Sequence, residues 1–315
     1  MAEMTTNREA YGHALVALGA ANPNVVVLEA DLGASTYTYL FGEQFPDRYF
    51  NMGVAEANMM GTAAGLAANG KIAFASTFCI FASLRAGEQV RNSIAYPNLN
   101  VKIVATNAGI EIGPDGATHQ ATEDVAVMRA IPNMTVVAPS DPIMTTQLVR
   151  QAAEFEGPLY MRLGRQPTPF LYDAKQRFQF GKAIILGEGD DVTLVAMGNM
   201  VNRAIAAREI LAGEGIQARV LDMHTIKPID RVALIQAARD TGCVVTAEDH
   251  NVIGGLGGAV AEVLSAEQPV PVVRVGVQDT FAQSGETEEL FEFYGMTPVH
   301  LADAARKAMR LRDSL

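Results

Sequence analysis

One carboxylate, Glu56, stands among uncharged residues in the stretch YFNMGVAEANMMGTAAGLAANG (49–70). A helix is expected over 55–68, and its first turn would hold this glutamate, where a negative charge gains about 0.3–1 kcal/mol from the helix dipole. Nearly every face of the helix is small or apolar, which is typical of a buried helix. Burying an unpaired charge costs on the order of several kcal/mol, which the dipole does not offset. Glu56 is therefore predicted to face a cleft or a bound group.

Two phenylalanines and a polar loop are further candidates. Phe78 and Phe81 are three residues apart at the start of an expected helical segment, so they can share a face, either as core aromatics or as an apolar wall for a flat ring. Asp115 and His119 lie in DGATHQ (115–120), a loop interrupted by glycine and preceded by proline. Such a loop either makes ordinary turn hydrogen bonds or contacts a ligand. The five histidines are scattered without a Cys/His cluster, so the sequence does not indicate a metal site.

Arg165 lies in the segment LGRQPTPFLYDAKQRFQFGKA (163–183). A planar guanidinium suits a phosphate or sulfonate group in two-point contact, although an arginine in a linker is more often solvated. Two prolines and an irregular mixture of aromatic and charged residues predict that this segment connects two domains. We place these domains at 1–178 and 179–315.

The elements that would position these residues alternate between short β-branched strands and helices, which predicts parallel sheets with crossover helices. The expected fold class is α/β, with two doubly wound domains and mainly parallel sheets. Strands are expected over 25–28, 72–75, 101–106, 135–138, 159–162, 192–196, 218–222, 244–247 and 272–275. Helices are expected over 55–68, 83–95, 121–130, 142–154, 201–212, 231–241 and 256–266.

Composition excludes several classes of partner. The chain has 315 residues and a net charge of −11, which argues against binding to nucleic acid or to an anionic membrane through bulk electrostatics. Cys79 and Cys243 lie in apolar strings and are expected as reduced core thiols. The amino-terminal residues form no apolar run of the signal-peptide type, and no 18-residue apolar span is uninterrupted. A cytoplasmic location is expected.

Several motifs together resemble one enzyme family. FNMGVAEANM (50–59) is similar to the segment of transketolases that carries the glutamate activating thiamine diphosphate. Four further motifs occur elsewhere in the chain, in the family's order and spacing. A fifth resembles the start of a helix in the family's carboxy-terminal domain. These are EADLGAS (29–35), STFCIFAS (76–83), ATNAGIEIGPDGATHQATED (105–124), LGRQPTP (163–169) and GGLGGAVAEVL (254–264). The resemblance covers nearly all of the chain but only the last half of a full-length transketolase. It implies a pyrimidine-binding domain followed by a transketolase carboxy-terminal domain.

The resemblance assigns a cofactor role to five residues. It implies that Glu56 binds the pyrimidine ring nitrogen of thiamine diphosphate and favours the imino tautomer that takes the proton from the thiazolium carbon. Phe78 and Phe81 would pack on the pyrimidine, and Asp31 and Leu32 would lie beside the thiazolium.

Five other positions match the family's substrate site. The resemblance implies that Asp115 and His119 contact sugar hydroxyls, with His119 as a proton-transfer group. Arg165 and Ser35 match positions near the substrate's phosphate. Asn107 stands where transketolases typically have a histidine, and it cannot carry positive charge. The identity of the sugar and of its terminal anion is therefore left open. A second departure is Leu84, which replaces a common third aromatic residue of the pyrimidine pocket.

The diphosphate half of the cofactor site is expected on another chain. In this family a GDG sequence, followed by an asparagine some 25–30 residues later, supplies the Mg²⁺ ligands, and this sequence contains no GDG. We therefore expect an amino-terminal transketolase subunit with that motif as the partner, assembled as two of each chain.

The implied function is that of the carboxy-terminal subunit of a split transketolase. With its partner the chain would transfer a two-carbon ketol unit from a ketose (phosphate) to an aldose (phosphate), through a dihydroxyethyl-thiamine-diphosphate intermediate. Three alternatives remain: the beta subunit of a 2-oxoacid dehydrogenase, a deoxyxylulose-phosphate-synthase-like enzyme, or a non-catalytic binding protein on the same fold. The task of the second domain is left open, because Glu248, His250 and Gly254 are only structural or interface candidates.

Overall fold

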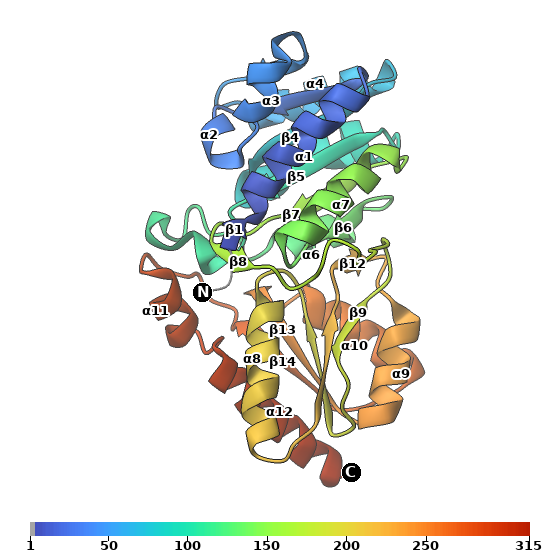
Figure 1. The fold of residues 1–315 in the computed structure, drawn as a ribbon, viewed down its shortest axis with the longest axis vertical. Helices are drawn as coiled ribbons and strands as arrows, with labels where there is room; N and C mark the ends of the chain where they lie inside the picture. The colour runs from blue at the N-terminus through green and yellow to red at the C-terminus, as the bar shows by residue number, and fades with distance from the viewer. Residues whose placement is uncertain (1–3) are drawn as a thin grey trace.

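Two mainly parallel sheets, placed one above the other along the long axis of the molecule, organise the chain (Figure 1). The structure is a computed structural model that describes residues 4–315. The first sheet has the strand order β12 (Thr225–Lys227), β6 (Thr135–Val137), β7 (Leu159–Arg162), β5 (Val101–Thr106), β4 (Ile72–Phe78), β2 (Val25–Glu29) and β3 (Tyr49–Asn51). The second has the order β14 (Val272–Val277), β13 (Val244–Asn251), β10 (Val192–Ala196), β11 (Ala218–Asp222) and β9 (Ile184–Gly187). A short antiparallel pair joins β1 (Met4–Thr6) to β8 (Pro167–Pro169).

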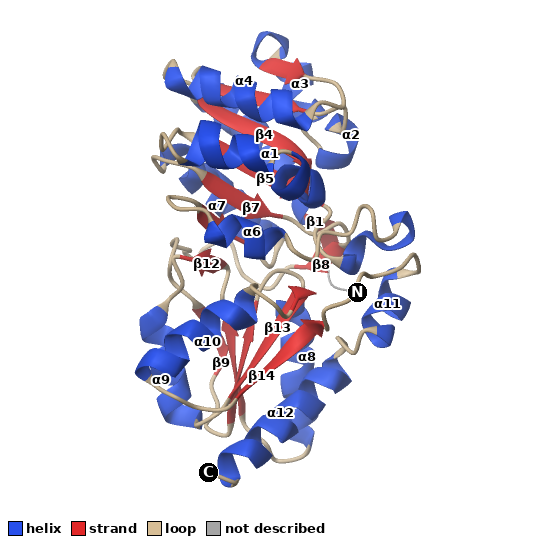
Figure 2. Ribbon diagram, turned by 180° about the vertical axis from the view of Figure 1, so that it is seen from behind, coloured by secondary structure: helices blue, strands red, loops and turns tan. Residues whose placement is uncertain are grey.

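Helices cover both faces of the two sheets (Figure 2), and this confirms the expected α/β class. Strands such as β2, β5 and β10 are buried along their whole length, as strands covered on both faces must be. The helices beside the first sheet are α1 (Asn7–Ala21), α4 (Glu56–Ala68), α6 (Asp124–Ala130) and α7 (Pro142–Glu154). Those beside the second are α8 (Met200–Gly213), α9 (Arg231–Thr241), α10 (Leu256–Glu267) and α12 (Pro298–Asp313). Shorter helices are α2 (Gly33–Thr36), α3 (Tyr39–Gln44), η1 (Pro46–Arg48), α5 (Gly87–Gln89), η4 (Ile110–Asp115) and α11 (Thr287–Phe293).

The expected helix over 83–95 is present but begins earlier and contains two π-helical stretches. These are η2 (Phe81–Arg85) and η3 (Val90–Ala95), in which the Ala86 N–H reaches back to the Phe81 oxygen over 3.0 Å. Phe78 was expected at the start of this helix, and that expectation is wrong. It is the last residue of β4, because its backbone pairs with Thr106 of β5. Wide π-type turns often mark functional positions, and this one starts at Phe81.

The helix expected over 121–130 begins only at Asp124. The residues before it pair with a neighbouring loop instead, since the Gly109 N–H donates to the Ala121 oxygen over 3.1 Å. The Asp124 carboxylate then accepts hydrogen bonds from Tyr160 and Arg162, which fixes the start of α6 in the core.

The two domains share structure across the expected boundary. Strand β12 follows that boundary in sequence, yet it pairs antiparallel with β6 of the first sheet, with Thr225 opposite Val137. One buried apolar cluster also runs without a break from Met59 and Ile103 of the first domain to Leu234 of the second. The division between 178 and 179 stays a prediction, and the first sheet is completed by a strand from beyond it.

The second-domain candidates of the sequence have structural partners. Glu248 accepts hydrogen bonds from the Leu256 and Gly257 N–H groups over 2.6 and 2.8 Å, which caps α10. His250 accepts from the Ala126 N–H over 3.3 Å and so ties the second domain to α6. Gly254 has φ +77°, in the left-handed region that favours glycine.

Both cysteines are buried and free. Among residues 4–315, none of the helices combines the length and the apolar character that crossing a bilayer requires.

Candidate functional site

The polar residues singled out in the sequence gather at the edge where the strands of the first sheet end. Asp31 follows β2, Asn107 follows β5 and Arg165 follows β7, while Phe78 closes β4. The register aligns these ends, with Glu29 opposite Ser76 and Phe78 opposite Thr106. The carboxyl edge of a doubly wound sheet is where such folds bind ligands.

Glu56 is buried without a partner for one of its oxygens. The residue is 3% exposed and begins α4, directly after the turn at Gly53. No donor among the described residues reaches its Oε2. Because buried carboxylate oxygens are almost always hydrogen-bonded, this atom is available to accept from a water, a bound molecule or a second chain. The helix packs against β4 and η2, which places Glu56 on the element next to the two phenylalanines.

Phe78 and Phe81 form an apolar wall. Their rings stack with centroids 5.8 Å apart and an interplanar angle of 13°. His119 stands edge-on to both, at 5.4 Å from the Phe81 ring and 6.3 Å from the Phe78 ring. Phe78 is buried and Phe81 partly exposed, whereas Leu84 is 52% exposed. The arrangement can hold a flat heteroaromatic ring with a titratable imidazole beside it.

A second group of residues meets around Arg8. The Arg8 Nη1 donates to the Ser35 oxygen over 2.8 Å and to Asn107 Oδ1 over 3.4 Å, and its Nη2 donates to the Arg165 oxygen over 3.1 Å. The Arg165 guanidinium in turn donates to Asp115 Oδ2 over 3.1 Å. Arg8 thus bonds three of the residues predicted for the substrate site, and Arg165 links a fourth, Asp115. Arg8 was missed in the sequence.

The charges in this group favour an anion. Burial lowers the pKa of Arg8; Tyr37 and Glu111 raise it, and the positive charge of Arg165 lowers it. Arg8 also lies in the first turn of α1, where a cation opposes the helix dipole. That unfavourable position is the one signal in the sequence that could have pointed to Arg8. The Arg8 and Arg165 side chains thus place two positive charges close together, and planar guanidinium groups suit a phosphate-like group.

The turn after β2 carries Asp31 and Leu32. Asp31 has φ +61° and its Oδ1 accepts from Asn51 Nδ2 over 3.0 Å. The Leu32 N–H donates to Glu29 Oε2 over 2.5 Å, and burial raises the pKa of Glu29. The Glu29 carboxylate therefore fixes the backbone of this turn, and the Asp31 side chain is exposed at the strand end.

The predicted residues fall into these two groups. Phe78, Phe81 and His119 form the apolar end, with Glu56 at the start of the adjacent helix α4. Ser35, Asn107, Asp115 and Arg165 form the polar end around Arg8, with Asp31 and Leu32 on the turn that leads to Ser35. Within residues 4–315, no group of three or more His, Cys, Asp or Glu residues is arranged to hold a metal ion.

Two family models match the chain. Residues 3–169 match the transketolase pyrimidine-binding domain, and residues 181–301 match the transketolase C-terminal domain.

Individual proteins described as transketolase sections or subunits are similar over nearly their whole length. A putative transketolase C-terminal section of Methanocaldococcus jannaschii is 49% identical over 306 residues, covering 96% of this chain and 96% of that protein. A 6-deoxy-6-sulfo-D-fructose transketolase subunit, SqwH, of a Clostridium species is 46% identical, covering 97% of this chain and 95% of that protein. A solved structure of a split gene transketolase, described as an inactive beta4 tetramer, superposes with a TM-score of 0.91 at 54% identity, covering 98% of this chain and all of that one.

Proposed function

Because the chain belongs to the transketolase family, we propose that it is the pyrimidine-binding subunit of a two-chain enzyme that transfers a two-carbon ketol unit from a ketose to an aldose. The observation that carries the proposal is the buried Glu56 Oε2, which lacks a donor among the described residues. The family implies thiamine diphosphate, whose aminopyrimidine would supply that donor.

The residues present fit this cofactor. Glu56 Oε2 would accept a hydrogen bond from the N–H that the pyrimidine ring nitrogen carries in the imino tautomer, and the stacked Phe78 and Phe81 rings would pack on the ring and exclude water. When bound, thiamine diphosphate supplies a carbon nucleophile and accepts the electron pair released when a carbon–carbon bond of the ketose breaks. His119, edge-on to both phenylalanines, would exchange protons with the sugar hydroxyls.

The polar end would bind the far end of the sugar. Arg8 and Arg165 supply two positive charges, and Asp115 would accept from a hydroxyl of the substrate. The neutral Asn107 and Ser35 complete this end. We propose a sugar with a terminal phosphate or sulfonate as the substrate class, because each group presents several oxygens to the guanidinium groups.

A second chain would complete the site. We propose that it carries the Mg²⁺ ligands and the diphosphate-binding GDG sequence, and that two copies of each chain assemble. The apolar side chains of Val54, Leu84 and Tyr96 are exposed next to the Glu56 helix. On that helix Gly61 and Gly65 leave room for a neighbouring backbone, since a Cβ added to either would meet nothing. Buried free cysteines support a cytoplasmic location for the complex.

The test is reconstitution with the partner chain. The chain is co-purified with a GDG-bearing amino-terminal subunit, supplied with thiamine diphosphate and Mg²⁺, and assayed with a ketose phosphate and an aldose phosphate. Ketol transfer by the complex, none by either chain alone, and a loss of at least about 100-fold in the Glu56→Gln complex are expected. Near-normal turnover by that variant, or turnover by the single chain, would contradict the proposal. Oxidative decarboxylation of a 2-oxoacid instead of transfer would favour the dehydrogenase alternative.

A further inference from the structure

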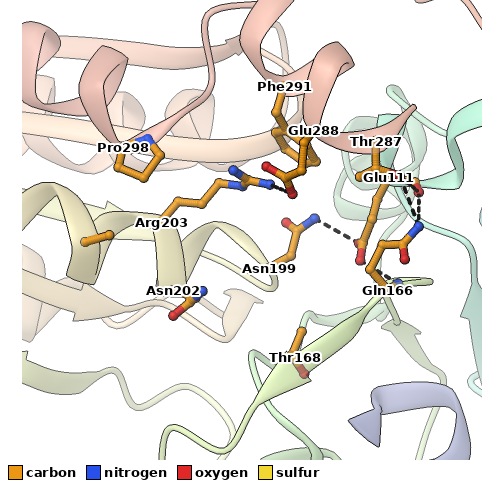
Figure 3. A pocket seen from close by; sticks show the side chains of 11 residues that line it. Glu111, Gln166, Thr168, Asn199, Asn202, Arg203, Thr287, Glu288, Phe291 and Pro298 are labelled. Carbon is orange, nitrogen blue, oxygen red and sulfur yellow. Dashed lines mark hydrogen bonds and ion pairs between the residues drawn. The ribbon is translucent and has the colours of Figure 1, made fainter. Parts of the chain in front are cut away.

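Glu111 lies where two loops of the substrate site meet the second domain (Figure 3). It is 2% exposed and belongs to η4, between Asn107 and Asp115. Its Oε1 accepts from the Gln166 N–H over 2.7 Å, and Gln166 directly follows Arg165. Its Oε2 accepts from Asn199 Nδ2 over 2.9 Å, and Asn199 precedes α8 of the second domain. One carboxylate therefore joins both loops to the second domain.

Two other second-domain side chains reinforce this junction. Thr287 Oγ1 donates to the Glu111 backbone oxygen over 3.2 Å and accepts from Gln166 Nε2 over 3.0 Å. Asp249 Oδ1 accepts from the Ile110 N–H over 2.9 Å, while its Oδ2 accepts from Asn199 over 3.2 Å. The loop that ends at Asp115 is thus held at both its backbone and its side chains by the second domain.

The two loops are packed closely against the carboxylates of this junction. A Cβ added at Gly164 would overlap the Glu111 carboxylate, and one added at Gly109 would overlap the Asp249 carboxylate. Gly109 also has φ +62°, which a residue with a side chain rarely adopts. The carboxylates of Glu111 and Asp249 are packed directly against the backbone of the two loops.

We propose that Glu111 is a positioning residue through which the second domain fixes Arg165 and Asp115 for binding of the substrate's terminal anion. This proposal rests on the proposed function, and it gives the second domain a task in the site. Glu111 does not touch the anion itself, because its two oxygens are occupied by Gln166 and Asn199.

Burial raises the pKa of Glu111 to about 7; the charge of Asp249 raises it, and the bonds from Gln166 and Asn199 and the charge of Arg162 lower it. A carboxylate kept in such surroundings is costly, which supports a task beyond packing. A cavity of about 240 Å³ opens beside it, lined also by Arg203 and Glu288, which pair over 2.7 Å.

The experiment compares substrates with and without the anion in the assembled two-chain complex. Glu111→Gln retains the size of the side chain but replaces one acceptor by an NH₂ group, which cannot accept from Gln166 or Asn199. We expect the KM for ribose 5-phosphate as acceptor to rise on the order of tenfold, with kcat within about twofold. With ribose, which lacks the phosphate, kcat/KM should be unchanged. Thr287→Val is expected to produce a smaller shift of the same kind.

Glu288→Gln is the matched control, because Glu288 lines the same cavity but its carboxylate pairs with Arg203 rather than with either loop. This variant should leave KM and kcat unchanged for both ribose 5-phosphate and ribose. A normal KM for ribose 5-phosphate in the Glu111→Gln complex, or an equal loss with ribose, would overturn the inference. Thermal melting of each complex distinguishes a loss of folding from a displacement of Arg165 and Asp115. If Glu111→Gln does not fold, Thr287→Val is used as the test variant in its place. A wild-type complex that neither transfers ketol units nor binds ribose 5-phosphate in calorimetry would instead refute the proposed function.

Discussion

Arg8 Nη1 lies 2.8 Å from the backbone oxygen of Ser35, so the first helix is bonded to the loop that follows the second strand. The same guanidinium reaches the backbone oxygen of Arg165, 157 positions further along the chain. This one side chain joins three separate segments of the polar end: α2 and the loops that follow β5 and β7.

Replacing Arg8 should therefore weaken binding of an anionic substrate. Arg8→Ala removes one of two guanidinium groups and is expected to raise the KM for a sugar phosphate by about 10- to 100-fold. Arg8→Lys retains the charge but loses the planar fork, so it should recover only part of the affinity. Steady-state kinetics of the assembled complex measures both. Equal KM values for Arg8→Ala and the wild type would remove Arg8 from the anion site.

The apolar wall makes a separate prediction about the cofactor. Phe81→Ala removes one of the two stacked rings and should weaken thiamine diphosphate binding by about tenfold, since an aromatic pair contributes about 0.5–1.5 kcal/mol beyond its buried area. Leu84→Ala is the comparison. Leu84 stands at the position of the family's third pocket residue, but it is 52% exposed and lies outside the stacked pair, so its removal should change the affinity by less than about threefold. Calorimetric titration of each complex with thiamine diphosphate in the presence of Mg²⁺ gives the two constants. A larger effect at Leu84 than at Phe81 would show that the wall is misassigned.

The exposed apolar side chains near Glu56 predict where the partner docks. Val54 is 74% exposed just before α4, and Val54→Asp should abolish or strongly weaken assembly with the partner by placing a charge in the interface. Val232→Asp, at a 73% exposed valine on α9, is the control and should assemble normally. The masses of the purified complexes show whether each variant assembles. Disruption by Val232→Asp alone would indicate that the interface lies on the second domain.

The contribution of Asp222 to stability should fall as pH rises from about 4 to 7, whereas His224 and His250, whose pKa burial lowers to about 4, act in the opposite direction. Burial raises the pKa of Asp222 from 3.8 to about 7; the hydrogen bonds from Ser140 and Tyr172 lower it, and Asp141 raises it. Asp222 therefore binds its proton more tightly in the folded state than in the unfolded state. The stabilisation that this provides is fully present below about pH 4 and is lost as pH rises to about 7. The full shift corresponds to on the order of 4 kcal/mol. Glu111 and Glu248, each with a pKa raised to about 7, act in the same direction.

Asp222→Asn isolates this contribution. The urea midpoint of the variant should change less between pH 5 and pH 8 than that of the wild type, since asparagine does not ionise. An identical pH dependence would mean that Asp222 does not lose its proton in this range.

The sequence was sufficient for features whose evidence is local. The strands over 101–106, 159–162, 192–196 and 218–222 occur at the expected bounds, because a short β-branched run between turns is a local signal. Glu56 could be noticed because its neighbours are uncharged and its burial would be costly. The roles assigned to it and to the other site residues stay predictions.

Features that depend on distant partners could not be predicted in this way. Arg8 has partners 27, 99 and 157 positions away, so nothing beside it in the chain reveals them. Glu111 was not among the predicted residues, because its partners Asn199 and Thr287 lie in the other domain. Phe78 was misplaced because the turn from strand to helix at residues 79–81 has no glycine or proline to mark it.

Strand β12 has a consequence for engineering the protein. Its three residues, Thr225–Lys227, close the edge of a sheet that otherwise belongs to the first half of the chain. A fragment ending at 178 would leave β6 with a bare edge, which is a template for pairing with other copies. Chimeras that exchange the second half between relatives would likewise replace this strand and must match it to β6. The halves are therefore not interchangeable modules: a join at the linker replaces β12, and a join beyond Lys227 would divide the second sheet between β10 and β13.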